Sequence, residues 1–174
     1  MPATRLDPAV LADIAVGLGC AEPLWRAVVR HQDERRPVRL LATDAYEAWV
    51  IGWRPDQGLD LHDHGDSAGV VLVVEGELHE RALTDGVLVD DLLPTGRVRW
   101  LPPGIIHAVT GAGDGPATSI HVYSPPLTGM TRFDDDLAPV GFDLLDDEEP
   151  VLPASAAGSL LHPSGRRARI AADA

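Results

Sequence analysis

This sequence of 174 residues has no long apolar run, no excess of basic residues and only one cysteine. The longest apolar stretches, such as GVVLVV at 69–74, are far shorter than the ~20 residues of a membrane-spanning helix. The first ten residues lack the basic and apolar regions of a signal peptide. We therefore expect a soluble, cytoplasmic protein with no membrane partner. Because Cys20 is the only cysteine, an internal disulfide and a multi-cysteine metal site are both excluded.

Charge makes nucleic acid an unsuitable partner. The chain has 27 acidic residues against 14 basic ones, a formal net charge of -13, and this field repels a phosphate backbone. The hydrophobic share of 45% and the charged share of 24% match an ordinary globular protein. One domain is expected at this length, as a monomer or a weak homo-oligomer.

Two short helices are predicted in residues 1–37, a region that we expect to pack on the rest of the domain. Asp7 before Pro8 is typical of a helix N-cap followed by proline in the first turn. The apolar side chains that follow share one helical face, namely those of Leu11, Ile14, Ala15 and Leu18. A second helix is predicted from about Pro23 to Asp33.

From Val38 the sequence changes to short β-branched and aromatic runs, separated by turn signals such as TDG, PTG and PPG. This spacing is typical of a sandwich or a barrel. We therefore predict an all-β body, with its strands between about Val38 and Ser124 and a barrel domain spanning 38–145. Residues 146–174 show no sustained periodicity and are predicted to be a loosely attached tail.

His62 and His64 are the first candidates for metal ligands. Residues i and i+2 of a strand point to the same side, so these two imidazoles would project together while Asp63 faces away. Two imidazoles on one face can chelate one ion. A surface strand with two solvated histidines would have the same spacing, so the pair alone does not decide between these readings.

The stretch GLDLHDHGDSAGVVLVVEGEL, residues 58–78, resembles the first motif of the cupin superfamily. This resemblance implies a cupin fold, a double-stranded β-helix or jelly-roll barrel, with two short N-terminal helices in this chain. Cupins usually add a glutamate four or five residues past the second histidine, where this chain has Ala68 and Gly69. WLPPGIIHAVT, residues 100–110, resembles the second motif, which supplies His107.

A site built from His62, His64 and His107 would offer a metal three neutral imidazoles and no carboxylate. Such ligands suit divalent iron, zinc, copper or nickel, and ligand type alone does not separate these metals. The ion would keep its full double positive charge, which favours an anionic, soft substrate donor such as a thiolate.

TSIHVYSPP, residues 118–126, brings three polar side chains to one face of a predicted strand. Ser119, His121 and Tyr123 lie at i, i+2 and i+4. One interpretation is a relay, in which Ser119 orients the His121 ring and the ring holds the tyrosine hydroxyl. The other is a histidine and a tyrosine that are simply hydrogen-bonded within a packed barrel.

These motifs together resemble the bacterial cysteine dioxygenase family of thiol dioxygenases, over about Val38 to Phe133. The resemblance rests on HDHG without the cupin glutamate, on the histidine of the second motif, and on SIHVYSPP. It implies an Fe(II) cofactor and the oxidation of L-cysteine by O2 to cysteine sulfinate. It also implies particular site residues: His62, His64 and His107 as metal ligands, and Ser119, His121 and Tyr123 as a catalytic triad.

Mammalian members of the family cross-link the triad tyrosine to a cysteine five residues beyond the second metal-binding histidine. That position is Gly69 here, so the resemblance implies that Tyr123 is a free phenol, as in bacterial members.

Two arginines are candidates for holding a substrate carboxylate, which needs a charged partner when buried. Arg39 has the place of the arginine on the first core strand of cysteine dioxygenases. The similar 3-mercaptopropionate dioxygenases have glutamine there and use an arginine nine residues after the tyrosine, the spacing of Arg132. The substrate therefore stays open, although Arg39 favours cysteine. Trp53 and Trp100 are candidates for the pocket wall or for core packing.

Three alternatives to a cysteine dioxygenase follow from the same residues. The first is a 3-mercaptopropionate dioxygenase, and the second is a cupin metalloenzyme with a non-thiol substrate. The third is a sensor that binds a metal or ligand in the barrel. A sensor is expected to carry an output domain, for which about 37 residues before the β region leave no room.

Overall fold

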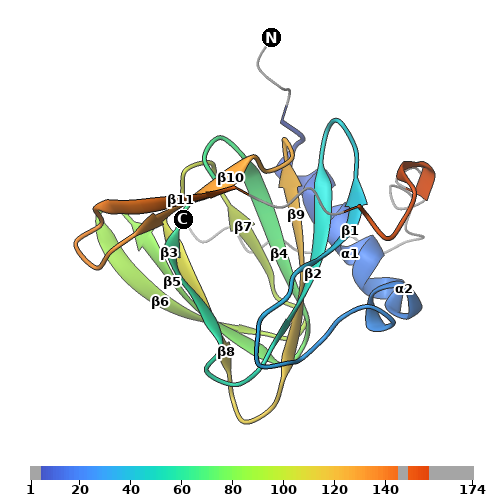
Figure 1. Ribbon diagram of the computed structural model, residues 1–174, viewed down its shortest axis with the longest axis horizontal. Coiled ribbons are helices and arrows are strands. Elements are labelled where there is room, and N and C mark those ends of the chain that lie inside the picture. Colours follow the sequence, from blue (N-terminus) through green and yellow to red (C-terminus); the bar gives the residue numbers. More distant parts are fainter. Residues whose placement is uncertain (1–4, 145–148, 157–174) are drawn as a thin grey trace.

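The computed structural model describes residues 5–144 and 149–156, and in these residues two antiparallel sheets face each other as the walls of a barrel (Figure 1). The five-stranded sheet has the order β1-β2-β9-β4-β7, and the six-stranded sheet the order β11-β10-β3-β8-β5-β6. The predicted all-β barrel with two short N-terminal helices is therefore confirmed. Within the described residues, no helix has the length and apolar character needed to span a membrane.

The strands are short and follow one another closely. The five-stranded sheet consists of β1 (Val38–Ala42), β2 (Glu47–Trp53), β4 (Ala68–Glu75), β7 (Val98–Leu101) and β9 (Ala117–Ser124). The six-stranded sheet consists of β3 (Gly58–His62), β5 (Glu77–Thr84), β6 (Val87–Pro94), β8 (His107–Ala112), β10 (Gly129–Phe133) and β11 (Pro139–Leu144). A 3-10 turn, η1 (Ala154–Ala156), follows the sheets.

Helix α1 (Pro8–Cys20) covers the outer face of the five-stranded sheet, where it contacts β4 and β9 (Figure 1). The Asp7 side chain accepts a hydrogen bond from the amide of Ala9 at 2.8 Å, as a helix N-cap does. The predicted apolar face is the buried one, with Leu11, Ile14, Ala15 and Leu18 in the core. The prediction for this helix is confirmed.

Helix α2 (Glu22–Arg26) is shorter than the predicted 23–33. It buries Trp25, and the chain beyond it runs along the sheet instead of continuing as a helix. The carbonyl oxygen of Arg30 lies so close to Gly52 that a Cβ at Gly52 would be 2.2 Å from it. His31 then reaches the carbonyl oxygen of Ala117 at 3.0 Å. These tertiary contacts outweigh the helical periodicity of the segment.

Strands β2 and β9 are buried on both faces, because α1 covers one face and the barrel interior the other. Ala48, Val50, Ile120 and Val122 point toward the helix and belong to the main hydrophobic cluster. The alternate residues point into the barrel, where the candidate site lies. Each of these strands therefore supports both the core and the site.

The β structure extends past the predicted strand limit at Ser124. Strand β10 pairs with β3 and with β11, although the acidic composition of 134–150 did not indicate the strand β11. Part of the predicted tail contacts the barrel, since the Leu152 amide donates to the Leu40 carbonyl at 2.8 Å. The remainder of that tail, residues 146–148 and 157–174, lies outside the described residues.

Packing between α1 and the sheet is expected to dominate the stability of the N-terminal region. Ile14 is 0% exposed, so Ile14→Ala should lower the free energy of unfolding by about 2–4 kcal/mol through lost contacts and a cavity. The matched control is Leu24→Ala, because Leu24 is 41% exposed in α2 and should cost well under ~1 kcal/mol. Urea unfolding measures both, and equal losses would contradict the proposed packing.

Candidate active site

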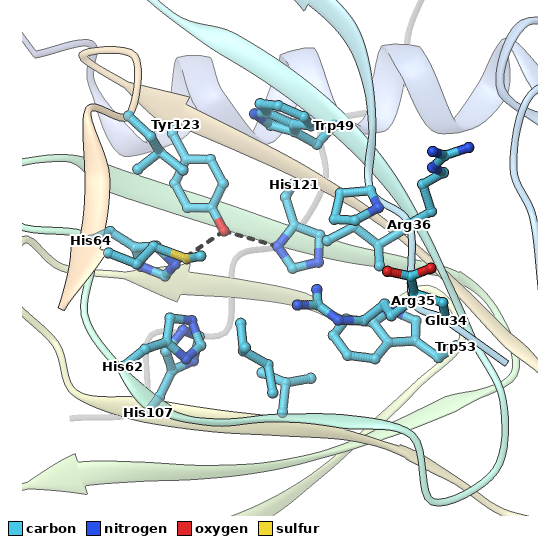
Figure 2. Close-up of a pocket in the computed structure, with 16 residues that line it drawn as sticks. Glu34, Arg35, Arg36, Trp49, Trp53, His62, His64, His107, His121 and Tyr123 are labelled. Atoms are coloured by element: carbon cyan, nitrogen blue, oxygen red, sulfur yellow. Dashed lines mark hydrogen bonds between the residues drawn. The ribbon is translucent and has the colours of Figure 1, made fainter. Parts of the chain in front are cut away.

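A cavity of about 310 Å³ opens between the two sheets. Figure 2 shows its polar side chains converging from both sheets: His121 and Tyr123 from β9, and the three predicted metal ligands from the opposite wall. The segment before β1 closes one side of the cavity, with Arg35 among the residues that line it.

His62 is the last residue of β3, and His64 lies just beyond the strand, before a turn at Gly65. The Asp63 amide donates to the Thr131 carbonyl at 2.9 Å, which keeps the segment extended along β10. The Asp63 carboxylate instead accepts a hydrogen bond from the Gly65 amide at 3.1 Å, within the turn. As a result, both histidines are buried on the cavity side, as the i, i+2 spacing indicated.

His107 begins β8 and is directly opposite His62 in the sheet. The ring centroids of His62, His64 and His107 are 4.6 to 5.2 Å apart. One potential ligand atom from each ring lies within 4.8 Å of the other two. No Asp or Glu oxygen belongs to this group within the described residues.

A buried carboxylate holds the His107 ring from behind. Glu80 of β5 is 1% exposed, and its Oε1 accepts a hydrogen bond from His107 Nδ1 at 2.8 Å. Its Oε2 accepts from Arg99 Nε at 2.6 Å. Although burial alone would raise the pKa of Glu80, the hydrogen bond from His107 and the charges of His107 and Arg99 lower it below its usual value. Glu80 is therefore ionised and fixes the hydrogen of His107 on Nδ1.

The residues of this cluster fit a metal ion. His107 Nε2 is buried and has no hydrogen-bond partner, which is costly unless another group binds it. His62 Nδ1 donates to the Asp60 carbonyl at 2.8 Å, so its Nε2 carries a free lone pair too.

Burial lowers the pKa of His62 to about 3, and the neighbouring His107 ring adds to this effect. Burial also lowers the pKa of His64 well below its usual value. Neutral imidazoles are the form that binds a divalent cation.

The three polar residues of β9 form a continuous hydrogen-bonded chain. Ser119 Oγ and His121 Nε2 are 2.8 Å apart, and His121 Nδ1 and the Tyr123 hydroxyl are 3.0 Å apart. The same hydroxyl lies 3.3 Å from His64 Nε2 (Figure 2). The triad therefore ends at the histidine cluster. Burial lowers the pKa of His121 to about 3 and raises that of Tyr123, so both are neutral.

Gly69 of β4 is paired with Tyr123 and makes room for its ring. A Cβ at this position would lie 2.7 Å from Tyr123 Cδ1. The phenol ring thus occupies the space that a side chain at position 69 would need.

The two arginines predicted to hold a substrate carboxylate lie outside the cavity lining. Arg39 stacks over the Trp49 ring and donates to the buried Glu47 carboxylate at 2.6 Å. Arg132 is exposed on β10, where its Nε lies 2.8 Å from Asp143. Because both guanidinium groups are engaged by carboxylates of the protein, the geometry favours neither as a substrate ligand.

Arg35 takes the position at the cavity that sequence reasoning gave to Arg39. Its guanidinium lies over the Trp53 ring, 5.2 Å from the centroid, and points toward the middle of the cavity (Figure 2). Burial lowers the pKa of the Arg35 guanidinium. It makes no ion pair with any residue of 5–144 or 149–156. A partly buried cation of this kind is suited to an anionic group of a ligand.

Comparison with known proteins agrees with this geometry. Residues 11–87 match the family model for cysteine dioxygenase type I. The fold is similar to that of the TT1209 protein of Thermus thermophilus, with a TM-score of 0.53 and 21% identity over 59% of this chain and 94% of that one. This part of the chain is therefore similar to cysteine dioxygenases of type I. The family match includes the first histidine pair and ends before β8 and β9.

Other solved structures have a similar barrel. A Klebsiella pneumoniae protein with a double-stranded β-helix domain aligns with a TM-score of 0.53 and 21% identity, over 67% of this chain and 93% of that one. An oxalate decarboxylase of Lactobacillus farciminis aligns with a TM-score of 0.53 and 16% identity, over 59% of this chain and 32% of that one. These identities show the fold alone, and they confirm the predicted cupin class.

Three residues of the candidate site were missed or undervalued in the sequence. Glu80 could have been found, because it is a charge on the inward face of β5, between the buried Leu78 and Ala82. Trp53 lines the cavity and donates a hydrogen bond to Ser119. Arg35 lies in a segment without periodicity, so no sequence pattern indicated where its side chain points.

The low pKa values of His62 and His121 predict how stability depends on pH. Unfolded histidine has a pKa of ~6.5, so below that pH the unfolded chain takes up protons that the folded site does not. The free energy of unfolding should therefore fall as pH falls toward 3. Between pH 7 and 5, each histidine should account for up to about 2 kcal/mol. Urea unfolding of the metal-free protein at both pH values measures this loss. His121→Gln should reduce it, and an undiminished loss in that variant would contradict the assignment.

Proposed function

We propose that this protein is an Fe(II)-dependent thiol dioxygenase that converts L-cysteine and O2 to cysteine sulfinate. One observation carries the proposal: three buried histidines and a hydrogen-bonded tyrosine hydroxyl meet at one wall of a cavity that also holds an arginine. The family match supports the same activity.

His62, His64 and His107 would hold the iron through imidazole nitrogens. The bound ion would supply the redox chemistry, in which both atoms of O2 are transferred to the thiol sulfur and one proton is released. The hydrogen bonds from Nδ1 of His62 and His107 keep their Nε2 lone pairs directed into the site. The absence of a carboxylate from the described ligand group leaves a thiolate as a favourable anionic partner.

Arg35 would bind the carboxylate of the substrate. Its guanidinium is the partly buried cation of the cavity, and a carboxylate can accept two parallel hydrogen bonds from it. The Tyr123 hydroxyl, held by His121, would hydrogen-bond to the anionic end of the bound substrate. The two groups would orient one small thiol acid between them, which is a proximity effect.

Removal of the carboxylate behind His107 should weaken metal binding. Glu80→Gln keeps the side-chain size but removes the charge, and we expect metal affinity to fall about 10–100-fold. His107→Ala should abolish stoichiometric binding, because it removes a ligand. Anaerobic titration with Fe(II) or Zn(II) measures both affinities. Glu77→Gln, an exposed position on the same strand, is the matched control. Wild-type affinity in His107→Ala would contradict the metal site.

The activity is tested by O2 consumption and sulfinate formation with L-cysteine, 3-mercaptopropionate and cysteamine. We expect the iron-loaded protein to be most active on L-cysteine.

Arg35→Gln should raise KM for L-cysteine about 10–100-fold through loss of a charged hydrogen bond. It should leave KM for cysteamine, which has no carboxylate, within about threefold. Arg36→Gln is the control, because the Arg36 side chain points away from the three histidines (Figure 2). Absence of sulfinate with every thiol would overturn the proposed function.

A further inference from the structure

The hydrogen-bonded chain of β9 extends one residue further than the predicted triad. The indole Nε1 of Trp53, on β2, donates to Ser119 Oγ at 2.9 Å. From there the chain continues through His121 to the Tyr123 hydroxyl. All four side chains are at most 6% exposed, so solvent does not share these hydrogen bonds.

Only the first bond of this chain has a direction fixed by chemistry, because an indole N–H is a donor and never an acceptor. The hydroxyl of Ser119 contacts two polar groups within the described residues, Trp53 and His121. Trp53 cannot accept the Ser119 hydrogen, so the acceptor must be His121 Nε2. His121 is neutral and therefore carries its one hydrogen on Nδ1, from which it donates to the Tyr123 oxygen.

The opposite direction would leave a buried donor without a partner. If His121 carried its hydrogen on Nε2, Ser119 Oγ would accept from both His121 and Trp53. The Ser119 hydrogen would then point at no acceptor, at a residue that is 0% exposed. Buried hydroxyl groups are hydrogen-bonded in the great majority of proteins, because an unpaired one loses its hydration without compensation.

We propose that Trp53 is a positioning residue that sets the direction of the chain, so that Tyr123 presents its hydroxyl hydrogen to the cavity. In the structure that hydrogen can be donated to His64 Nε2, 3.3 Å away. When a metal takes the His64 lone pair, the same hydrogen is available to an anionic substrate group. The use of Tyr123 as a donor in catalysis rests on the proposed function, whereas the direction of the chain does not.

Trp49 provides a matched control for Trp53. Both tryptophans are on β2, point into the barrel and line the same cavity. The Trp49 Nε1 atom is buried without a hydrogen-bond partner, so it is not part of the chain. A tryptophan-to-phenylalanine change at either position removes similar bulk, but only Trp53→Phe removes the fixed donor.

The tautomer of His121 is the direct test. In a long-range 1H–15N NMR spectrum of the full chain, zinc-loaded at neutral pH and assigned with His121→Gln, we expect only the Nδ1–H form. Trp53→Phe lets water replace the indole N–H and accept from Ser119, so the Nε2–H form should rise to on the order of a tenth or more. Trp49→Phe should keep the single tautomer.

Turnover gives a second readout. With iron and L-cysteine, Trp53→Phe should lower kcat about 10-fold, because orientation of the donor is lost. It should change KM by less than about threefold, because phenylalanine keeps an aromatic ring beneath the Arg35 guanidinium. An Nε2–H tautomer in the wild-type protein, or a pure Nδ1–H form in Trp53→Phe, would overturn the proposal. If Trp53→Phe does not fold, the wild-type tautomer decides. Absence of wild-type turnover would overturn the proposed function without affecting the tautomer result.

Discussion

The site depends on hydrogen bonds that hold two of its imidazole rings from the side opposite the cavity. The Asp60 carbonyl and the Glu80 carboxylate bind Nδ1 of His62 and His107, which leaves their Nε2 lone pairs facing the same point. Burial lowers the pKa of His62 and of His64, so these two rings are uncharged at neutral pH. A cluster of protonated imidazoles at this spacing would repel itself, so the low pKa values are a condition for the geometry.

Glu80 explains how the barrel tolerates a charge beside this cluster. A buried carboxylate requires a paired cation and satisfied oxygens, and Arg99 and His107 supply both. The negative charge therefore reaches the site only through the His107 ring. This differs from a carboxylate ligand, which would partly neutralise the ion and occupy one of its positions. The arrangement keeps an anionic donor behind the histidine and leaves the cavity side open.

Strand β9 connects stability to chemistry. One of its faces packs Ile120 and Val122 against α1, and the other carries the Ser119–His121–Tyr123 chain. Gly69 on the neighbouring strand makes room for the Tyr123 ring. The hydroxyl position is therefore set by backbone pairing and core packing together. A shift of the β9 register by one residue would turn the Ser119–His121–Tyr123 chain out of the cavity, because side chains alternate between faces.

Much of the fold and part of the candidate site followed from the sequence, because local periodicity governs them. Alternation along residues 117–124 predicted which side chains of β9 share a face, and the two-residue spacing of His62 and His64 predicted their common direction. The amphipathic pattern of α1 predicted its buried residues. The second helix was predicted too long, since contacts of Arg30 and His31 with the sheet override its periodicity.

The sequence alone thus determined that short strands dominate the chain and that Ser119, His121 and Tyr123 share one strand face, since side-chain direction in a strand is a local property. Only the tertiary structure decided which arginine reaches the cavity. Arg39 is on a strand, but Glu47 holds it, whereas Arg35 arrives from an irregular segment that packs over Trp53. The partners Glu80–His107 and Trp53–Ser119 are 27 and 66 residues apart. Such contacts depend on how strands pair across the sheets, which no local pattern specifies.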